Sequence, residues 1–132
     1  MTNREVIDEF RASGGTVGGF FADKDLLLLH HIGARSGRTR VTPLLRQSVG
    51  EGWAVFASAG GAPEHPGWYH DLVAEPNVAV EVGAETIPVT AKVLEGAERD
   101  EVWDRQVERH PFFGDYEDRS GRTIPVVLLE PR

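Results

Sequence analysis

The chain has 132 residues, a formal net charge of −7 and 40% apolar residues, which suits one domain with a modest core. The absence of cysteine excludes disulfides, thiolate metal sites and cysteine nucleophiles, and the acidic balance argues against a dedicated nucleic-acid binder. No apolar run approaches the roughly 18 residues of a membrane span, and residues 1–5 lack the apolar stretch of a signal peptide.

The pattern of the chain predicts short strands with a few helices between them. Residues 2–5 have the spacing of a capping box, so they predict the start of an amphipathic helix. Pro43 falls inside a predicted strand, where it requires an edge or a bulge because it cannot donate to a ladder. In chain order, we predict a helix over 2–13, strands over 26–32, 41–49 and 53–57, a helix over 68–75, strands over 78–82 and 86–94, a helix over 98–109 and a strand over 124–129.

This spacing of strands indicates the class of fold. Six or so short strands with hairpin spacing and few helices favour a closed or partly closed antiparallel barrel, although the pairing of the strands does not follow from the pattern. Late in the chain, residues 110–116 gather aromatic side chains. They predict either a hydrophobic plug or one wall of a substrate cavity, and the sequence does not decide between the two.

The most informative segment is a basic turn. Residues 26–50 contain four arginines and no acidic residue, and three of the arginines fall in Gly33-Ala-Arg-Ser-Gly-Arg-Thr-Arg40. Free backbone N–H groups, a hydroxyl and guanidinium forks suit a phosphate or carboxylate, so the turn predicts a site for a small anionic ligand. The alternative is an ordinary hairpin loop with solvated arginines.

The pentapeptide Arg-Ser-Gly-Arg-Thr occurs twice, at 35–39 and again at 119–123. Five residues are too few to indicate a duplication. The second copy follows Asp115, Glu117 and Asp118, which would cancel much of its positive field. Only the first copy is therefore predicted to bind an anion.

Two further segments are candidates for binding a flat ligand. Residues 56–61 end a strand in small side chains, which let a ring or a pyrophosphate approach the backbone; the alternative is a routine strand exit. Residues 65–71 hold an indole, a phenol, an imidazole and a carboxylate that could surround a planar ligand, unless Trp68 packs into the core. The five histidines show no metal-ligand spacing, and His30 and His31 point to opposite faces of a strand, so we predict no metal site. The serines lack the elbow motif of a hydrolase.

Five motifs in order resemble a known family. Together they look like the deazaflavin-dependent nitroreductases, which use coenzyme F420. The five motifs are an apolar strand, the basic turn through Leu44, residues 53–61, the segment Pro66-Gly-Trp-Tyr-His-Asp-Leu-Val-Ala-Glu-Pro-Asn77 and the terminal Arg122-Thr-Ile-Pro. The resemblance covers about residues 20–130. It implies an α+β, mainly antiparallel split β-barrel of the FMN-binding-like type with a few flanking helices. Residues 1–132 would form a single deazaflavin-binding domain, with 1–19 as an N-terminal helix and loop.

The resemblance also implies which positions bind the coenzyme. Arg35, Ser36 and Arg40 would bind its phosphate and acidic tail, and the strand beneath it would contain Val41, Thr42, Pro43 and Leu44. The backbone beside its ring would come from Phe56, Ala57, Ser58 and Ala59. The segment that closes over it would contain Gly67, Trp68, Tyr69, His70 and Asp71.

Phe113, also counted among the coenzyme-binding residues, and Tyr116 match a mobile wall of the substrate pocket. Ser58 and Tyr116 are the candidate catalytic residues, because either hydroxyl could polarise or protonate an acceptor. Three positions depart from the family: Asp71 stands where Asn is common, and His110 and Phe113 stand where some members have tyrosines. These departures bear on the substrate, including any nitro compound, more than on the coenzyme.

The implied function is hydride transfer from reduced F420 to a planar hydrophobic acceptor such as a quinone, an enone or a nitro compound. Three alternatives stay open: an FMN-binding split-barrel reductase, a non-catalytic F420-binding protein, and nucleic-acid binding through the basic turn. The last needs a wider basic face than this chain offers. A homodimer also stays open. We expect a cytoplasmic protein, peripheral at most at the inner face of the membrane, because residues 2–14 are too polar to insert deeply.

Overall fold

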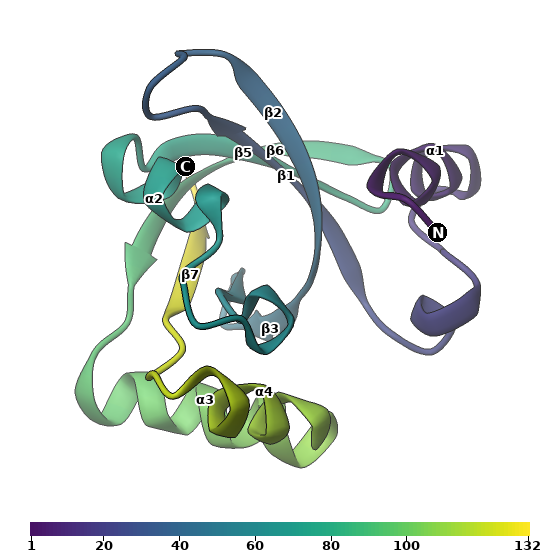
Figure 1. Ribbon diagram of the computed structural model, residues 1–132. Coiled ribbons are helices and arrows are strands. Elements are labelled where there is room, and N and C mark those ends of the chain that lie inside the picture. The colour runs from purple at the N-terminus through teal and green to yellow at the C-terminus, as the bar shows by residue number, and fades with distance from the viewer.

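A computed structural model describes all residues, 1–132, and its centre is one curled sheet flanked by helices (Figure 1). The strand order is β2-β1-β5-β6-β7-β4-β3, and every neighbouring pair is antiparallel. The predicted mainly antiparallel split barrel is therefore confirmed. The elements are α1 (Asn3–Ser13), η1 (Gly19–Phe21), β1 (Leu26–Ile32), β2 (Thr39–Leu45), β3 (Gln47–Val49), β4 (Gly52–Phe56), η2 (Ala59–Gly61), α2 (Gly67–Ala74), β5 (Asn77–Val82), β6 (Glu85–Val93), α3 (Gly96–Arg109), α4 (Phe112–Ser120) and β7 (Val126–Pro131), where η marks a one-turn 3-10 helix.

The first helix forms as the capping box predicts. The Thr2 hydroxyl accepts the N–H of Glu5 at 3.1 Å, and the Glu5 side chain reaches back to the backbone N–H of Thr2. Gly14 ends the helix in the left-handed conformation, with φ at 76°. Val6 and Phe10 are buried against the sheet, so α1 packs on β1 and β2, the two strands that the basic turn connects. No helix in the structure is long and apolar enough to cross a bilayer.

The prediction of one strand over residues 41–49 is wrong, because the chain forms two. β2 ends at Leu45 and β3 begins at Gln47. Between them the N–H of Arg46 donates to the Asp25 carbonyl at 3.0 Å, and its Nε donates to the Leu26 carbonyl at 2.8 Å. These bonds turn the chain away from β1 and toward β4. Pro43 lies on β2, an outer strand of the sheet, so the prediction of an edge position is confirmed.

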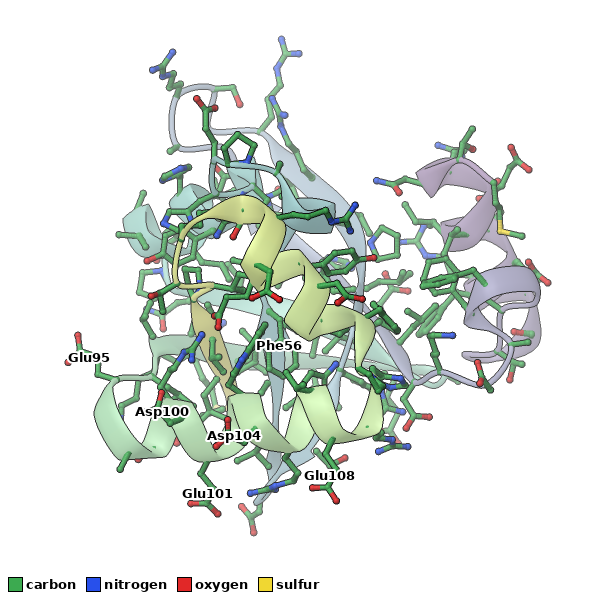
Figure 2. The ribbon with its side chains drawn as sticks, turned by 60° about the horizontal axis from the view of Figure 1, so that its bottom comes forward. Phe56, Glu95, Asp100, Glu101, Asp104 and Glu108 are labelled. Carbon is green, nitrogen blue, oxygen red and sulfur yellow. The ribbon has the colours of Figure 1, made fainter.

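A second difference is α4, which the sequence did not predict as a helix. Its Phe113 side chain is 3% exposed and packs with Phe56 and Trp103, so α3 and α4 cover the end of the sheet near β4 and β7. In Figure 2 Phe56 lies on the face that these helices cover. The acidic side chains of α3 and its N-cap are exposed; they are Glu95, Glu98, Asp100, Glu101, Asp104 and Glu108, and all but Glu98 are labelled in Figure 2. The other predicted elements are confirmed to within a residue or two at each end.

Candidate functional site

The basic turn connects β1 to β2 and is held by its own hydrogen bonds. The N–H of Gly33 donates to the Arg38 carbonyl, and the N–H of Gly37 donates to the Gly33 carbonyl, both at 2.9 Å. Ser36 Oγ accepts the N–H of Arg38 at 3.2 Å, and Gly37 has a φ of 69°. A Cβ on Gly33 would lie 2.5 Å from Ser36 Oγ, so a side chain at this position would displace the serine hydroxyl. The turn is therefore a defined structure and not a loose loop.

The arginines of this turn have no acidic partner. Arg35, Arg38 and Arg40 are exposed and form no ion pair, whereas Arg11, Arg99 and Arg109, among others, each bind a carboxylate. Two of the three face a cleft of about 690 Å³, together with Ser36. The full lining of this cationic cleft is Asn3, His31, Gly33, Ala34, Arg35, Ser36, Arg40, Val41, Thr42, Gly67, Trp68, His70 and Asp71. Arg38 points elsewhere and does not line it.

One carboxylate reaches the turn from α2. Asp71 Oδ1 accepts the backbone N–H of Ala34 at 2.9 Å, and its Oδ2 accepts from Nδ1 of His31 at 2.8 Å. The other ring nitrogen of His31 lies 2.9 Å from Thr42 Oγ1. Burial alone would raise the pKa of Asp71, but the hydrogen bonds from Ala34 and His31 outweigh it and lower that pKa. This chain of contacts ties α2, β1, β2 and the basic turn into one wall.

A second cavity of about 370 Å³ lies beside the cationic cleft and is mainly apolar. Thr42 and Trp68, together with Asn3 of α1, line both spaces, so the two are adjacent. The remaining lining of this aromatic cavity is Phe20, Phe21, Pro43, Leu44, Leu45, Phe56, Ser58, Ala59, Gly60, Phe112, Phe113 and Tyr116. Residues 20 and 21 come from η1, and residues 112–116 come from α4, so segments far apart in the chain face each other across it.

The loop that follows β4 forms the polar part of this cavity. Three consecutive residues have positive φ: Ala59 at 48°, Gly60 at 63° and Gly61 at 87°. For alanine this conformation costs about 1 kcal/mol or more, so the surrounding contacts must hold it in place. A Cβ on Gly61 would lie 3.3 Å from Cα of Tyr116, which shows how closely α4 packs on the loop.

Most of the site residues taken from the resemblance gather around these two spaces. Trp68 is 7% exposed and belongs both to the core and to the cavity walls. Packing in the core therefore does not prevent it from contacting a planar ligand. Two of the named residues line neither space: Ala57 is fully buried, and Tyr69 packs against His65 and lines a separate apolar pocket. The sequence reasoning missed Asn3, Phe20, Phe21, His31 and Leu45 as lining residues. Gly33, Ala34, Gly60 and Phe112 also line the two spaces, and each belongs to a segment that the sequence had marked as a candidate.

The histidines lie far from a metal-binding arrangement. His30 Nε2 lies 2.7 Å from Glu81 Oε2, whereas His31 faces Asp71, so the two adjacent rings do point to opposite faces. No group of three or more histidine, cysteine or acidic side chains gathers in a way that could hold an ion.

Comparison with known proteins supplies the relatives of this chain. The sequence model of the F420H(2)-dependent quinone reductase family matches residues 2–131 of this chain. An F420H(2)-dependent quinone reductase of Mycobacterium tuberculosis is 38% identical over 109 residues, which is 80% of this chain and 73% of that protein. The solved structure of an F420-H2 dependent reductase (FDR-A) superposes with a TM-score of 0.73 at 40% identity, covering 80% of this chain and 93% of that one. A structure described as a domain-swapped dimer superposes with a TM-score of 0.75 at 36% identity, covering 96% of each chain.

Proposed function

Because this chain belongs to the F420H(2)-dependent quinone reductase family, we propose that it is an F420H2-dependent oxidoreductase that reduces a planar hydrophobic acceptor, with a quinone as the preferred class. The observation that carries the proposal is that the two spaces lie side by side. A cleft with unpaired arginines adjoins an aromatic cavity, and Asn3, Thr42 and Trp68 contribute to the lining of both.

The residues present fit an anionic coenzyme with a flat ring. Arg35 and Arg40, with no carboxylate of their own, supply guanidinium donors, and Gly33 leaves the turn free of a side chain where Ser36 approaches. Next to them, Pro43, Leu44 and Phe56 give apolar surface of the kind that covers a planar ring. We therefore propose the whole chain, residues 1–132, as one deazaflavin-binding domain.

Each part of the site has a distinct role in this proposal. When bound, the reduced coenzyme supplies a hydride. Arg35, Ser36 and Arg40 bind the phosphate and acidic tail, and so orient the ring at the far end of the molecule. The chain Thr42–His31–Asp71 holds the turn in place through the N–H of Ala34. Placing two reactants in contact geometry in this way lowers the barrier by several kcal/mol.

The aromatic cavity receives the acceptor. Tyr116 packs edge to face on Phe112 and on Phe113, with ring centroids 5.5 Å apart, and the rings of Phe112 and Phe113 are tilted by 32° at 4.9 Å. This aromatic wall excludes water from the reacting end. A planar ring fits against such a wall better than a flexible or charged substrate does. Tyr116 and Ser58 line the same cavity, and in this proposal their hydroxyls are the groups that polarise or protonate the acceptor.

The proposal is tested by titrating the purified protein with F420 and with FMN while tryptophan fluorescence is recorded. Trp68, one of the three tryptophans, lines both spaces, so a ligand bound in either one should change the part of the emission that comes from Trp68. We expect F420 to bind more tightly than FMN, and Arg35→Gln or Arg40→Gln to weaken F420 binding by about tenfold, the loss of one charge-assisted contact. Tighter binding of FMN would reject this choice of coenzyme.

Arg38 offers a matched control. It lies in the same turn and also forms no ion pair, but it does not line the cleft. Arg38→Gln therefore removes the same charge, and we expect F420 affinity to change by no more than about threefold at moderate salt. An equal loss in all three variants would mean that the turn acts only through its general field. If F420 binds but no quinone, enone or nitro compound reoxidises it, the alternative of a non-catalytic F420-binding protein is favoured.

Two further parts of the proposal concern surroundings. We propose a cytoplasmic location, with contact limited to the inner face of a membrane where lipid-soluble quinones reside. We also propose a homodimer, because a similar chain forms a domain-swapped dimer. Equilibrium sedimentation at several protein concentrations distinguishes the dimer from the monomer.

A further inference from the structure

The second copy of the pentapeptide adopts the same local turn as the first. Ser120 Oγ accepts the N–H of Arg122 at 3.3 Å, as Ser36 Oγ accepts the N–H of Arg38 at 3.2 Å. The glycine between them has a φ of 66° in one copy and 69° in the other. The two turns differ in the direction of the arginine side chain that follows the glycine. In the first copy the side chain of Arg38 is exposed, whereas in the second copy Arg122 is directed into the protein.

Arg122 binds a single loop through all three of its guanidinium nitrogens. Its Nε donates to the Ala62 carbonyl at 3.2 Å. Its Nη2 donates to the carbonyls of Ser58 at 3.2 Å and Glu64 at 3.1 Å. Its Nη1 lies 2.8 Å from Nδ1 of His65. Four contacts thus connect one side chain from the end of α4 to both ends of the loop over residues 58–65.

The contact with His65 fixes the state of that ring. A guanidinium can only donate, so Nδ1 of His65 must accept and carries no proton. The proton of the neutral ring is then on Nε2. Burial, with the charges of Arg122 and of His70 nearby, lowers the pKa of His65, which agrees with this arrangement. Tyr69 and His70 of α2 also pack near the His65 ring, with ring centroids 4.9 and 6.0 Å away.

The loop needs such a clamp because its backbone is strained. Ala59 has a φ of 48°, and it lines the aromatic cavity together with Ser58. Within the loop, the N–H of Gly61 donates to the Ser58 carbonyl at 2.9 Å, so Arg122 and Gly61 share one acceptor. Without the guanidinium, that carbonyl and those of Ala62 and Glu64 lose a donor, and the left-handed alanine has less to hold it.

We propose that Arg122 is a positioning residue: it holds the loop over residues 58–65 in the conformation that presents Ser58 and Ala59 to the reacting end of the cavity. The inference rests on the proposed function for its catalytic consequence. Its structural consequence, a loop whose order depends on one side chain, stands on the contacts alone. Arg122 touches neither the cavity nor the cleft, so its effect passes through the loop.

The first test uses the protein without coenzyme and measures amide hydrogen exchange. We expect Arg122→Gln to accelerate exchange in residues 58–65 by about tenfold or more, while α1 and β1 keep their protection. Arg132→Gln is the matched control, because Arg132 also donates to carbonyls, those of Val78 and Val89, but far from this loop. It should leave residues 58–65 unchanged. Unchanged exchange in Arg122→Gln, or faster exchange spread evenly over the chain, overturns the proposal.

His65 supplies a second pair of variants in case Arg122→Gln does not fold. The side-chain oxygen of asparagine can accept from Nη1 as Nδ1 does, whereas leucine cannot. We expect His65→Asn to protect the loop as the wild type does, and His65→Leu to lose several-fold of that protection. Equal behaviour of the two variants would mean that the contact with Arg122 does not hold the loop, and would overturn the proposal.

The catalytic consequence is measured with F420H2 and a quinone. We expect Arg122→Gln to lower kcat by about tenfold, with the dissociation constant of F420 and the KM for the quinone changed by less than about threefold, because the coenzyme tail binds elsewhere. A rise in both constants with kcat intact would overturn the positioning role. Absence of activity in the wild type would count against the proposed function, and the exchange measurement would still decide whether Arg122 orders the loop.

Discussion

The carboxylate of Asp71 accepts the backbone N–H of Ala34 at 2.9 Å and so brings a negative charge to a turn whose own sequence has none. The same carboxylate binds His31, and Arg40 is close enough to help lower its pKa. Asp71 therefore acts on an anion site in two opposite ways. It holds the turn in a binding conformation, and it reduces the positive potential that the arginines create.

The first prediction separates these two effects with Asp71→Asn. The amide oxygen can still accept from Ala34, while the charge is removed. We expect F420 to bind about three- to tenfold more tightly at low salt, since one charge in a partly exposed site is worth on the order of 1 kcal/mol. The gain should shrink as salt is added. Fluorescence titration at two salt concentrations measures both.

Asp71→Ala is the companion variant, because it removes the hydrogen bond as well as the charge. We expect F420 binding to be weaker than in Asp71→Asn, by the cost of leaving the N–H of Ala34 and the ring of His31 without their acceptor, about 1 to 3 kcal/mol. If the alanine variant binds as tightly as the asparagine variant, the contact with Ala34 does not position the turn.

The second prediction concerns stability in mild acid. Burial, together with nearby cations, lowers the pKa values of His65 and His110 below their ordinary 6.5. The folded state therefore holds fewer protons than the unfolded chain between those lowered values and 6.5, so stability falls as pH drops through this window. We expect Tm to decrease already below pH 6.5, and His65→Asn with His110→Asn to remove most of that decrease.

A separate loss follows at lower pH. The hydrogen bonds of Arg11 and His30 lower the pKa of Glu81 below its ordinary 4.5, and the pKa of Asp71 is lowered as well. The stability that these two carboxylates contribute is fully present above their ordinary values and is lost as pH falls through the lowered ones. Thermal melts over the whole acid range should therefore show two steps. A single step below pH 4 in the wild type would contradict the assignment to the histidines.

The sequence predicted the fold well where the pattern is local. The capping box at Thr2, the apolar run of β1 and the hairpin of β5 and β6 each involve neighbours in the chain, and each is confirmed. The break at Arg46 could not be predicted, because its N–H and its guanidinium bind the carbonyls of Asp25 and Leu26, some twenty residues away. α4 was missed because Pro111 and Gly114 suggest a loop, while burial of Phe113 under α3 stabilises the helix.

The same division holds for the site. The arginines of the basic turn were identified from their spacing and from the absence of acidic neighbours in the chain. Asp71 as the partner of Ala34 was not predicted, since the two lie 37 residues apart. The role of the second pentapeptide could not be predicted from the sequence either. The nearby acidic residues suggested only that its positive charge would be cancelled, whereas Arg122 binds three backbone carbonyls and His65.

The third prediction concerns a buried pair of amides. Gln47 and Gln106 are 5% and 1% exposed, and Nε2 of Gln47 donates to Oε1 of Gln106 at 3.1 Å. Gln47 Oε1 and Gln106 Nε2 have no partner. We expect Gln106→Met alone to destabilise the fold by about 1 to 2 kcal/mol, because it removes a partner from Gln47 while the carbonyl of Val102 remains.

The double variant Gln47→Met/Gln106→Met should recover that loss. It replaces four buried polar atoms by an apolar pair of similar volume, and we expect a stability within about 1 kcal/mol of the wild type or above it. Denaturant unfolding of the wild type, both single variants and the double variant forms a complete cycle. If the double variant loses more free energy of unfolding than the two single variants lose together, the amides specify the packing of α3 on β3.

The last prediction distinguishes the two candidate catalytic hydroxyls. Ser58 and Tyr116 line the same cavity from the loop after β4 and from α4. A phenol is a stronger acid than an alcohol, so we expect Tyr116 to be the group that protonates the acceptor. Tyr116→Phe keeps the ring that packs 5.5 Å from both Phe112 and Phe113, and removes only the hydroxyl. We expect kcat to fall about a hundredfold, with F420 affinity unchanged.

Ser58→Ala is the matched comparison, and we expect a loss in kcat of less than about tenfold, since the backbone of that residue stays in place. The solvent isotope effect on kcat should be larger than that on F420 binding in the wild type, and it should change in Tyr116→Phe because the proton then comes from water. A Tyr116→Phe enzyme with full kcat assigns proton delivery elsewhere. In that case the ring of Tyr116 serves as a wall, and Ser58 becomes the remaining hydroxyl in the cavity.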